Sequence, residues 1–347
     1  MKHSYRRFFG LGAAALFLLA ACGGTAGGSP SPAAKVIKVG LVTDTGGLND
    51  KSFNHLAYLG LQKAIADLGI KGDVIESKSG DEYVPNLTNF ASKGYDLVIG
   101  NGFLMQPAMG TVAKLFPNVH FAIVDGAGTD AKFNDLKLPN VQDLYFKEQE
   151  PGALVGVIAG MMEKQKKAAK NLGVISAVGG ISIPPVNHYL AGYKWAAAME
   201  DPGIKVLIGY SNDFNDPTKC SGIAKSQISN NSDFVFQVAG GCGVGALQAA
   251  GQANVWSFGV DADQKDVNKS VAASALKKVD VAVFNAIQSQ VNGTWAGGPT
   301  TFSLQNGGVG YQVDNLTLPA DIQAEVDNVA AKIKSGALTP PDTIPTP

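Results

Sequence analysis

Carboxylates and aromatic rings recur in the short loops that directly follow apolar, strand-like segments of this 347-residue chain. Carboxylates accept hydrogen bonds from hydroxyl and amino groups, and aromatic rings stack on flat ligands. Together these residue types are typical of a polar pocket with apolar walls. The residues are Asp44, Asp50, Phe53, Phe103, Asp125, Phe214 and Asp261, and the amide of Asn49 lies in the first of these loops.

Some of these residues also have a simpler structural interpretation. Asp50 or Ser52 can cap the helix that is expected to begin near residue 52. Phe53 falls in the first turn of that helix, where an aromatic ring belongs to the core more often than to a ligand site. Spacing alone therefore leaves both roles open.

The loops are positioned by alternating strands and helices. Short segments rich in Val, Ile and Leu predict strands at 36–42, 96–100, 121–124, 172–176, 205–209, 234–238 and 255–260. Amphipathic patterns predict helices at 52–68, 107–116, 153–162, 185–199 and 245–250. This alternation predicts an α/β fold with parallel sheets, and the chain length favours two sheets over one. Ligands bind such sheets beyond the carboxyl ends of the strands, where the polar loops would meet.

A glycine-rich segment offers a rival function. Residues 241–245, Gly-Cys-Gly-Val-Gly, follow a predicted strand and open a helix, and Asp261 lies twenty positions after Gly241. This is close to the dinucleotide fingerprint of a dehydrogenase. However, the segment lies in the second half of the chain, and no histidine follows a strand to act as an acid or base. Because a hydrolase elbow and metal-ligand spacing are also missing from the sequence, we expect no enzyme, no cofactor and no metal site.

The N-terminal segment is typical of an exported lipoprotein. A basic start precedes a short apolar run that ends in Leu19-Ala20-Ala21-Cys22, which resembles a lipobox. About a dozen apolar residues are too few to span a bilayer and are typical of a signal peptide. We therefore expect residues 1–21 to be removed, Cys22 to carry lipid, and residues 22–34 to form a flexible tether. An uncut membrane anchor is the alternative, and Arg6-Arg7 leaves export by the twin-arginine route open.

The charge balance disfavours a nucleic-acid partner. Residues 1–21 contain three basic residues and no acidic ones, so their removal changes the formal net charge from −1 to −4. Phosphate binding needs a basic patch, and the lysine clusters of this sequence are short. The remaining chain is long enough for one large or two medium domains.

Cys220 and Cys242 remain as a pair once Cys22 is assigned to lipid. In an oxidising compartment such a pair is typical of a disulfide, and two separately buried thiols are the alternative.

Several longer strings of the sequence point together to one family. They are residues 42–54, 148–160, 179–180 with 192–193, 213–217, 259–264, 274–280 and 332–336. These strings span nearly all of the chain after Cys22, in order. They resemble the basic membrane protein family of substrate-binding lipoproteins, which includes PnrA-like purine nucleoside receptors.

The resemblance implies a periplasmic-binding-protein fold of type I, in which two Rossmann-like lobes with parallel sheets are joined by a three-segment hinge. On that pattern we expect a first lobe of residues 35–145 with about 273–299. We expect a second lobe of residues 146–272 with about 300–336, and a tail over residues 337–347. The implied function is that of a binding component of an ABC importer, with a permease as partner.

The resemblance also implies roles for individual residues. In nucleoside-binding members two phenylalanines sandwich the base, and these match Phe53 and Phe214. The position that matches Asp125 hydrogen-bonds the base, while those that match Asp261 and Lys277, or the lysine after it, hold the ribose hydroxyls. The other expected ligand-binding positions are Asp44, Asn49, Asp50, Phe103 and Gly241.

The sequence therefore predicts a lipid-anchored receptor on the extracytoplasmic face of the cell membrane that captures a purine nucleoside. A receptor for a sugar or another small polar metabolite is the alternative, because Phe53 and Phe214 could equally stack on a sugar ring. Asp125 favours the nucleoside, since an additional carboxylate suits the edge of a purine. Which nucleoside is preferred cannot be predicted from these residues.

Overall fold

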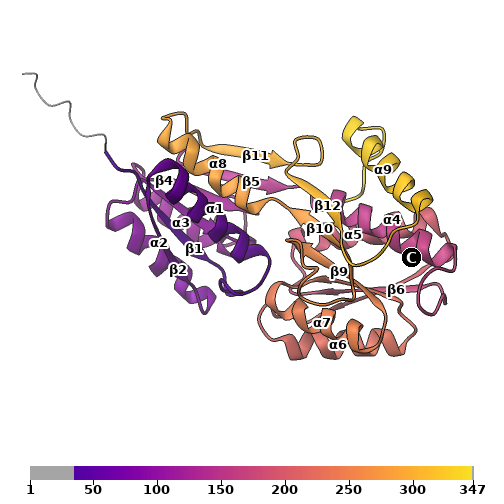
Figure 1. Ribbon diagram of the computed structural model, residues 1–347. Helices are drawn as coiled ribbons and strands as arrows, with labels where there is room; N and C mark the ends of the chain where they lie inside the picture. Colours follow the sequence, from indigo (N-terminus) through magenta and orange to yellow (C-terminus); the bar gives the residue numbers. More distant parts are fainter. Residues whose placement is uncertain (1–34, 346–347) are drawn as a thin grey trace, which may run out of the picture. The chain divides into compact units, whose positions relative to one another are not determined.

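The computed structural model describes residues 35–345, and the expected signal peptide, tether and lipid attachment at Cys22 lie outside them. Within these residues two six-stranded sheets form the centres of two lobes (Figure 1). The first sheet is entirely parallel and runs in the order β11-β5-β4-β3-β1-β2. Its strands are β1 (Lys38–Thr43), β2 (Lys71–Glu76), β3 (Leu97–Asn101), β4 (His120–Val124), β5 (Val141–Phe146) and β11 (Gly298–Phe302).

The second sheet repeats this pattern in the order β12-β10-β9-β8-β6-β7. Its strands pair in parallel except for β12, which lies antiparallel to β10 at one edge. They are β6 (Val174–Gly179), β7 (Lys205–Tyr210), β8 (Phe234–Val238), β9 (Trp256–Asp261), β10 (Val271–Lys277) and β12 (Val309–Val313). The expected α/β class with two sheets is confirmed.

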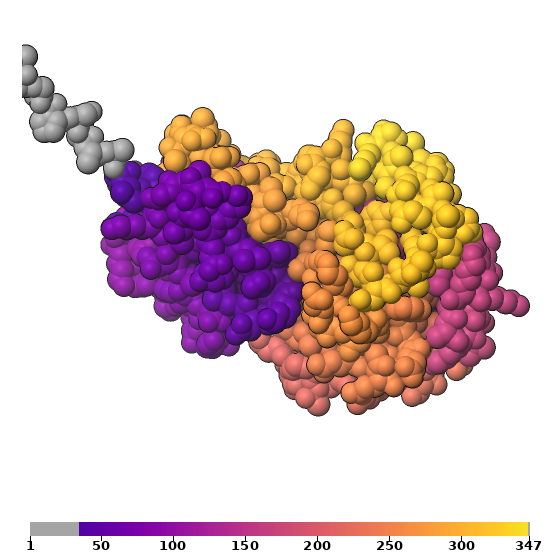
Figure 2. Space-filling view, viewed as in Figure 1, coloured from indigo at the N-terminus to yellow at the C-terminus, as the bar shows by residue number. Residues whose placement is uncertain are grey.

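Helices cover both sheets. Those of the first lobe are α1 (Phe53–Leu68), α2 (Tyr83–Ser92), α3 (Gln106–Leu115) and α8 (Val279–Val291), with short 3₁₀ turns at η1 (Gly80–Glu82) and η2 (Phe103–Met105). Those of the second lobe are α4 (Gln149–Lys164), α5 (Pro184–Glu200), α6 (Pro217–Ser229), α7 (Gly240–Gln252) and α9 (Ala320–Ser335). In Figure 2 the yellow surface of α9 and the segment after it lies beside the second lobe. None of the helices in residues 35–345 is long and apolar enough to cross a membrane.

Three connections within the described residues carry the chain between the sheets. They link β5 to α4, β10 to α8, and β11 to β12. The hinge thus has three segments, as the resemblance implied. The lobe boundaries differ by a few residues from those expected, because β10 stays in the second sheet as far as Lys277 and β11 in the first as far as Phe302. No local sequence signal marks the end of β10 or of β11.

The structure has several elements that the sequence patterns did not predict. The strands are β2, β5, β10, β11 and β12, and the helices are α2, α6, α8 and α9. Three of these strands lie at sheet edges, and each contains at most two of the Val, Ile and Leu residues by which the other strands were predicted. Strand β10 is interior but consists largely of small residues, Val-Ala-Ala-Ser-Ala-Leu-Lys, so it lacks the β-branched composition that predicts strands.

Candidate functional site: the cleft between the lobes

A cavity lies where the carboxyl ends of the two sheets face each other. It contains about 620 Å³ of space outside the protein atoms, part of it open to solvent. Residues after β1, β3 and β4 line one side, and residues after β6, β8 and β9 line the other. This is the position at which open α/β sheets bind ligands.

Eight of the ten expected ligand-binding residues line this cavity. They are Asp44, Asp50, Phe53, Phe103, Asp125, Phe214, Asp261 and Lys277. Asn49 does not line it, and its side chain is exposed in the loop before α1. Gly241 does not line it either, and an added Cβ there would lie 3.3 Å from the carbonyl oxygen of Phe214 and 3.6 Å from Cα of Asp50 in the first lobe. Whether any of these residues contacts a ligand stays a prediction.

A buried ion cluster joins the two lobes at the cavity. Nζ of Lys277, at the end of β10, lies 2.6 Å from Oδ1 of Asp125, which follows β4 in the other lobe. The same ammonium lies 2.9 Å from Oε1 of Glu148, the N-cap of α4. The rings of Phe53 and Phe146 lie 5.0 and 4.8 Å from it, so the charge is also enclosed by aromatic faces. Lys277 is therefore the lysine that faces the cavity, while Lys278 caps α8.

The cluster contains more acids than bases, and its pKa values differ accordingly. Burial raises the pKa of Asp125 to about 7, although Lys277 lowers it in part. Burial also opposes ionisation of Glu148, but attraction to Lys277 and His188 outweighs it and holds that pKa below its usual value. Burial alone would lower the pKa of Lys277, but its acidic neighbours raise it, so the ammonium stays charged. When a proton is taken up, Asp125 is the carboxylate that accepts it.

Asp261 faces the same cavity from the end of β9. Its Oδ2 accepts a hydrogen bond of 2.6 Å from the hydroxyl of Ser52 in the first lobe, and its Oδ1 accepts one of 3.1 Å from Tyr189 on α5. Burial raises its pKa. Asp261 and Asp125 both have positive φ angles, 62° and 64°, which is unusual for residues other than glycine and is typical of constrained functional loops.

Asp50 and Asp44 are used mainly to hold the first loop. The carboxylate of Asp50 accepts hydrogen bonds from the backbone N–H groups of Ser52, Asn54 and His55 and so caps α1. Burial raises its pKa to about 7. Oδ1 of Asp44 accepts from the N–H of Gly46 at 2.8 Å and from the side-chain amide of Asn54 at 2.7 Å. The capping interpretation of Asp50 therefore describes what the residue does in this structure.

The apolar walls come from both lobes. Phe53, the first residue of α1, and Phe214, in the loop after β7, both line the cavity. A Cβ on Gly180 would come within 2.3 Å of the Phe214 ring, so the glycine is needed for the ring to lie where it does. Phe103 lines the cavity as well, and its ring stacks on the half-exposed ring of Phe133 at 5.3 Å.

Three residues of the site were not singled out in the sequence. Glu148 binds Lys277, Tyr189 binds Asp261, and Ser52, considered only as a cap, binds Asp261 across the cleft. Glu148 lies in a string shared with the family, which is a signal that could have found it. Tyr189 lies inside a helix, and no local pattern distinguishes it from a core residue.

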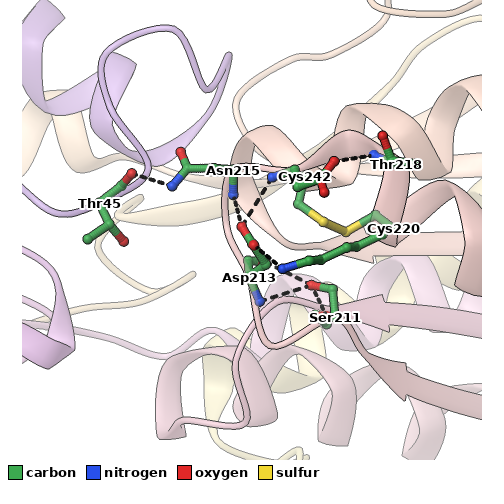
Figure 3. A network of polar contacts seen from close by, with 10 residues as sticks. Thr45, Ser211, Asp213, Asn215, Thr218, Cys220 and Cys242 are labelled. Atoms are coloured by element: carbon green, nitrogen blue, oxygen red, sulfur yellow. Dashed lines mark hydrogen bonds and ion pairs between the residues drawn. A yellow bond between two sulfur atoms is a disulfide. The ribbon is translucent and has the colours of Figure 1, made fainter. Parts of the chain in front are cut away.

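Cys220 and Cys242 form a disulfide with a Cα–Cα distance of 5.5 Å (Figure 3). The bond joins the first turns of α6 and α7 in the second lobe. It thus lies beside the segment that carries Phe214.

The glycines of the dinucleotide-like segment pack against protein. A Cβ on Gly243 would meet the side chain of Gln237 at 1.7 Å, and one on Gly245 would meet the carbonyl of Pro217 at 1.9 Å. These glycines therefore serve the close packing of α7 on its own lobe. Among residues 35–345 no group of three or more acidic, histidine or cysteine side chains is arranged to hold a metal ion.

Residues 37–343 match the family described as ABC transporter substrate-binding protein PnrA-like. The chain belongs to this family. An uncharacterized lipoprotein of Pyrococcus horikoshii is 35% identical over 325 residues, covering 89% of this chain and 76% of that protein. The ABC transporter nucleoside-binding protein BmpA of Lactococcus lactis is 31% identical over 333 residues, which cover 89% of this chain and 89% of that protein.

A solved structure supports the same assignment. The solute-binding protein of an ABC transporter system from Aeropyrum pernix superposes with a TM-score of 0.78 at 28% identity, over 88% of this chain and 94% of that one. The chain is thus a PnrA-like substrate-binding protein of an ABC transporter, a family of solute-binding proteins whose partners are a small ligand and a permease. Several of its relatives are named lipoproteins or basic membrane proteins.

Proposed function

We propose that this PnrA-like protein captures a purine nucleoside in the cleft between its lobes and presents it to the permease. One observation carries the proposal. Two phenylalanines from opposite lobes, Phe53 and Phe214, line the same cavity as three buried carboxylates and one lysine. The BmpA relative is named as a nucleoside-binding protein, which supports the same ligand class.

A purine nucleoside suits each part of this cavity. The base offers two faces for stacking, and each contact between a base and an aromatic ring contributes roughly 1–3 kcal/mol. Asp125 can accept a hydrogen bond from the edge of the base, and its proton can be donated to a ring nitrogen when the carboxyl is neutral. Each oxygen of Asp261 accepts one hydrogen bond from protein, which leaves acceptor capacity for the ribose hydroxyls.

Closure of the cleft would follow from ligand binding. Since Phe53 and Phe214 belong to different lobes, only the closed arrangement brings both rings to one ligand. A ligand shifts the equilibrium toward the state that it binds more tightly. The permease would then recognise the closed form.

Calorimetry of the purified protein with inosine, guanosine, adenosine, ribose and NAD tests the ligand class. We expect heat with at least one purine nucleoside and little with ribose or NAD. Binding of ribose without binding of any nucleoside would establish the sugar receptor instead. Asp261→Ala should weaken the binding of ribonucleosides more than the binding of free bases. The bases lack the hydroxyls from which this carboxylate would accept hydrogen bonds.

We further propose that Cys22 carries lipid and holds the protein at the extracytoplasmic face of the cell membrane. The lipobox-like string and the lipoprotein names of the relatives support this. Expression with a labelled fatty acid should label the wild-type chain and leave Cys22→Ala unlabelled. Equal labelling of both would contradict the anchor.

A further inference from the structure

The two lobes also touch outside the ligand cavity. The side-chain amide of Asn215 in the second lobe donates a hydrogen bond of 2.5 Å to the backbone carbonyl of Thr45 in the first (Figure 3). Neither residue lines the cavity, and Asn215 is exposed. The contact therefore lies at the rim, where no ligand atom is needed to form it.

Asn215 is held in place by its own loop. One carboxylate oxygen of Asp213 accepts from the backbone N–H of Asn215 at 2.7 Å and from that of Asp216 at 3.1 Å. Its other oxygen binds Lys219 at 2.6 Å. Because the backbone at Asn215 is already held, only the side-chain rotamer of Asn215 has to be fixed when its amide finds a partner.

The same segment carries the aromatic wall. The carbonyl of Phe214 accepts a hydrogen bond of 2.9 Å from the N–H of Cys242, and Cys242 is bonded to Cys220 (Figure 3). The ring of Phe214 and the amide of Asn215 thus belong to consecutive residues of one segment that is attached to α7. A contact made by Asn215 fixes the position of the ring relative to the other lobe.

The acceptor is equally well placed. Thr45 lies in the loop after β1, where Gly46 donates to Asp44 at 2.8 Å and Leu48 donates to Glu76 at 3.0 Å. These bonds hold the carbonyl of Thr45 in a fixed direction toward the second lobe. The backbone segments that carry the donor and the acceptor are therefore both held by other hydrogen bonds.

We infer that Asn215 is a latch that holds the Phe214 wall against the first lobe and slows release of the ligand. It is a positioning residue, since it does not line the cavity. The hydrogen bond exists only while the lobes are closed, so it lowers the free energy of the closed state alone. The part of the inference that concerns ligand release rests on the proposed nucleoside function.

Two variants and one control test the latch. Asn215→Ala removes the donor, and Asn215→Asp places a carboxylate against a carbonyl oxygen at nearly unchanged size. Asn230→Ala is the control, because the Asn230 amide donates to Ser226 within its own helix and lobe. Inosine release is followed by stopped flow. We expect dissociation about three- to tenfold faster in Asn215→Ala, faster still in Asn215→Asp, and unchanged in the control.

A second measurement does not depend on the ligand. Spin labels at Leu115→Cys and Leu172→Cys, exposed positions in the first and second lobe, report the distance between the lobes in the protein without nucleoside. We expect a smaller closed population in Asn215→Ala than in Asn230→Ala. Equal populations together with equal release rates would overturn the latch. Failure of inosine and the other nucleosides to bind the wild type would overturn the proposed function, and the label distances would still decide the latch.

Discussion

The two ends of α4 hold buried glutamates whose pKa values are shifted in opposite directions. Glu148 is the N-cap residue, and Glu163 lies in the last turn. Burial opposes ionisation of Glu148, but Lys277 and His188 lower its pKa. Burial, together with the neighbouring Asp233, raises the pKa of Glu163 to about 7, although the N–H of Gly173 lowers it in part. The helix dipole acts in the same sense, because it favours a negative charge at the N-terminus and disfavours one at the C-terminus.

The difference between these clusters lies in the presence of a cation. At the cleft, Lys277 lies within 2.9 Å of both Asp125 and Glu148. At the far end, Glu163 accepts a bond of 3.0 Å from the N–H of Gly173, and Asp233 accepts from the backbone of residues 170 and 171. These backbone donors carry no full positive charge, and the pKa of Glu163 is raised. Lys277 therefore holds the pKa of Glu148 below its usual value, although that of Asp125 beside it stays near 7.

The largest expected effect comes from removing that lysine. Lys277→Met leaves Asp125 and Glu148 buried without a cation, which should destabilise the protein by about 3–5 kcal/mol at pH 8. Their pKa values would rise in the folded state, so the loss should shrink at pH 5.5, where the folded protein can retain the protons. Urea unfolding at both pH values measures this. Nucleoside binding should fall at least a hundredfold.

Lys278→Met is the matched control, because this lysine is adjacent but lies outside the cluster. Its stability and affinity should stay near those of the wild type. Equal stability of Lys277→Met and Lys278→Met at pH 8 would mean that Lys277 does not stabilise the buried carboxylates at the cleft end of α4.

Much of the cleft could be predicted from the sequence, because strand ends are local features. Asp44, Phe103 and Asp125 follow apolar strands, and the carboxyl ends of parallel strands converge. The same reasoning placed Asp50 at the cleft but could not decide between ligand and cap. That depended on three backbone N–H groups whose directions only the folded loop defines.

The remainder of the site depends on contacts between distant segments. Glu148 reaches Lys277 because two hinge connections, 129 positions apart, lie side by side. Tyr189 reaches Asp261 because α5 packs beside α4 with one particular face toward the cleft. Edge strands such as β2 were missed because half of their residues are polar. None of these relations has a period or a motif in the sequence.

Removal of either aromatic ring of the cavity should reduce nucleoside affinity by an intermediate amount. Phe53→Ala and Phe214→Ala should each weaken nucleoside binding at least tenfold, because each removes one stacking face. Of these two rings, Phe53 is the one that lies against Lys277, at 5.0 Å. Phe53→Ala, unlike Phe214→Ala, should therefore change the pH dependence of binding between pH 6 and 8, around the pKa of Asp125. Calorimetric titrations at several pH values separate the two variants. Unchanged affinity in either would assign that ring to the core.

The smallest effect on binding is expected at the far end of α4. Unfolded Glu163 titrates near its ordinary pKa of 4.5, whereas the folded carboxyl holds its proton to about pH 7. The folded state thus loses stability relative to the unfolded state as the pH rises between these values, and the cost is complete above pH 7. Glu163→Gln removes the charge and keeps an acceptor for the N–H of Gly173. It should stabilise the protein at pH 8 by about 1–2 kcal/mol and have little effect at pH 4.5.

Nucleoside affinity should stay unchanged in Glu163→Gln, since this residue does not line the cavity. Glu325→Gln on α9 is the control for loss of one negative charge, and its stability should depend on pH as that of the wild type does. Denaturant unfolding from pH 4.5 to 8 compares the three proteins. A parallel shift of Glu163→Gln at all pH values would mean that Glu163 is ionised in the folded protein. The two ends of α4 would then share one charge state, and the lysine at the cleft would not explain their difference.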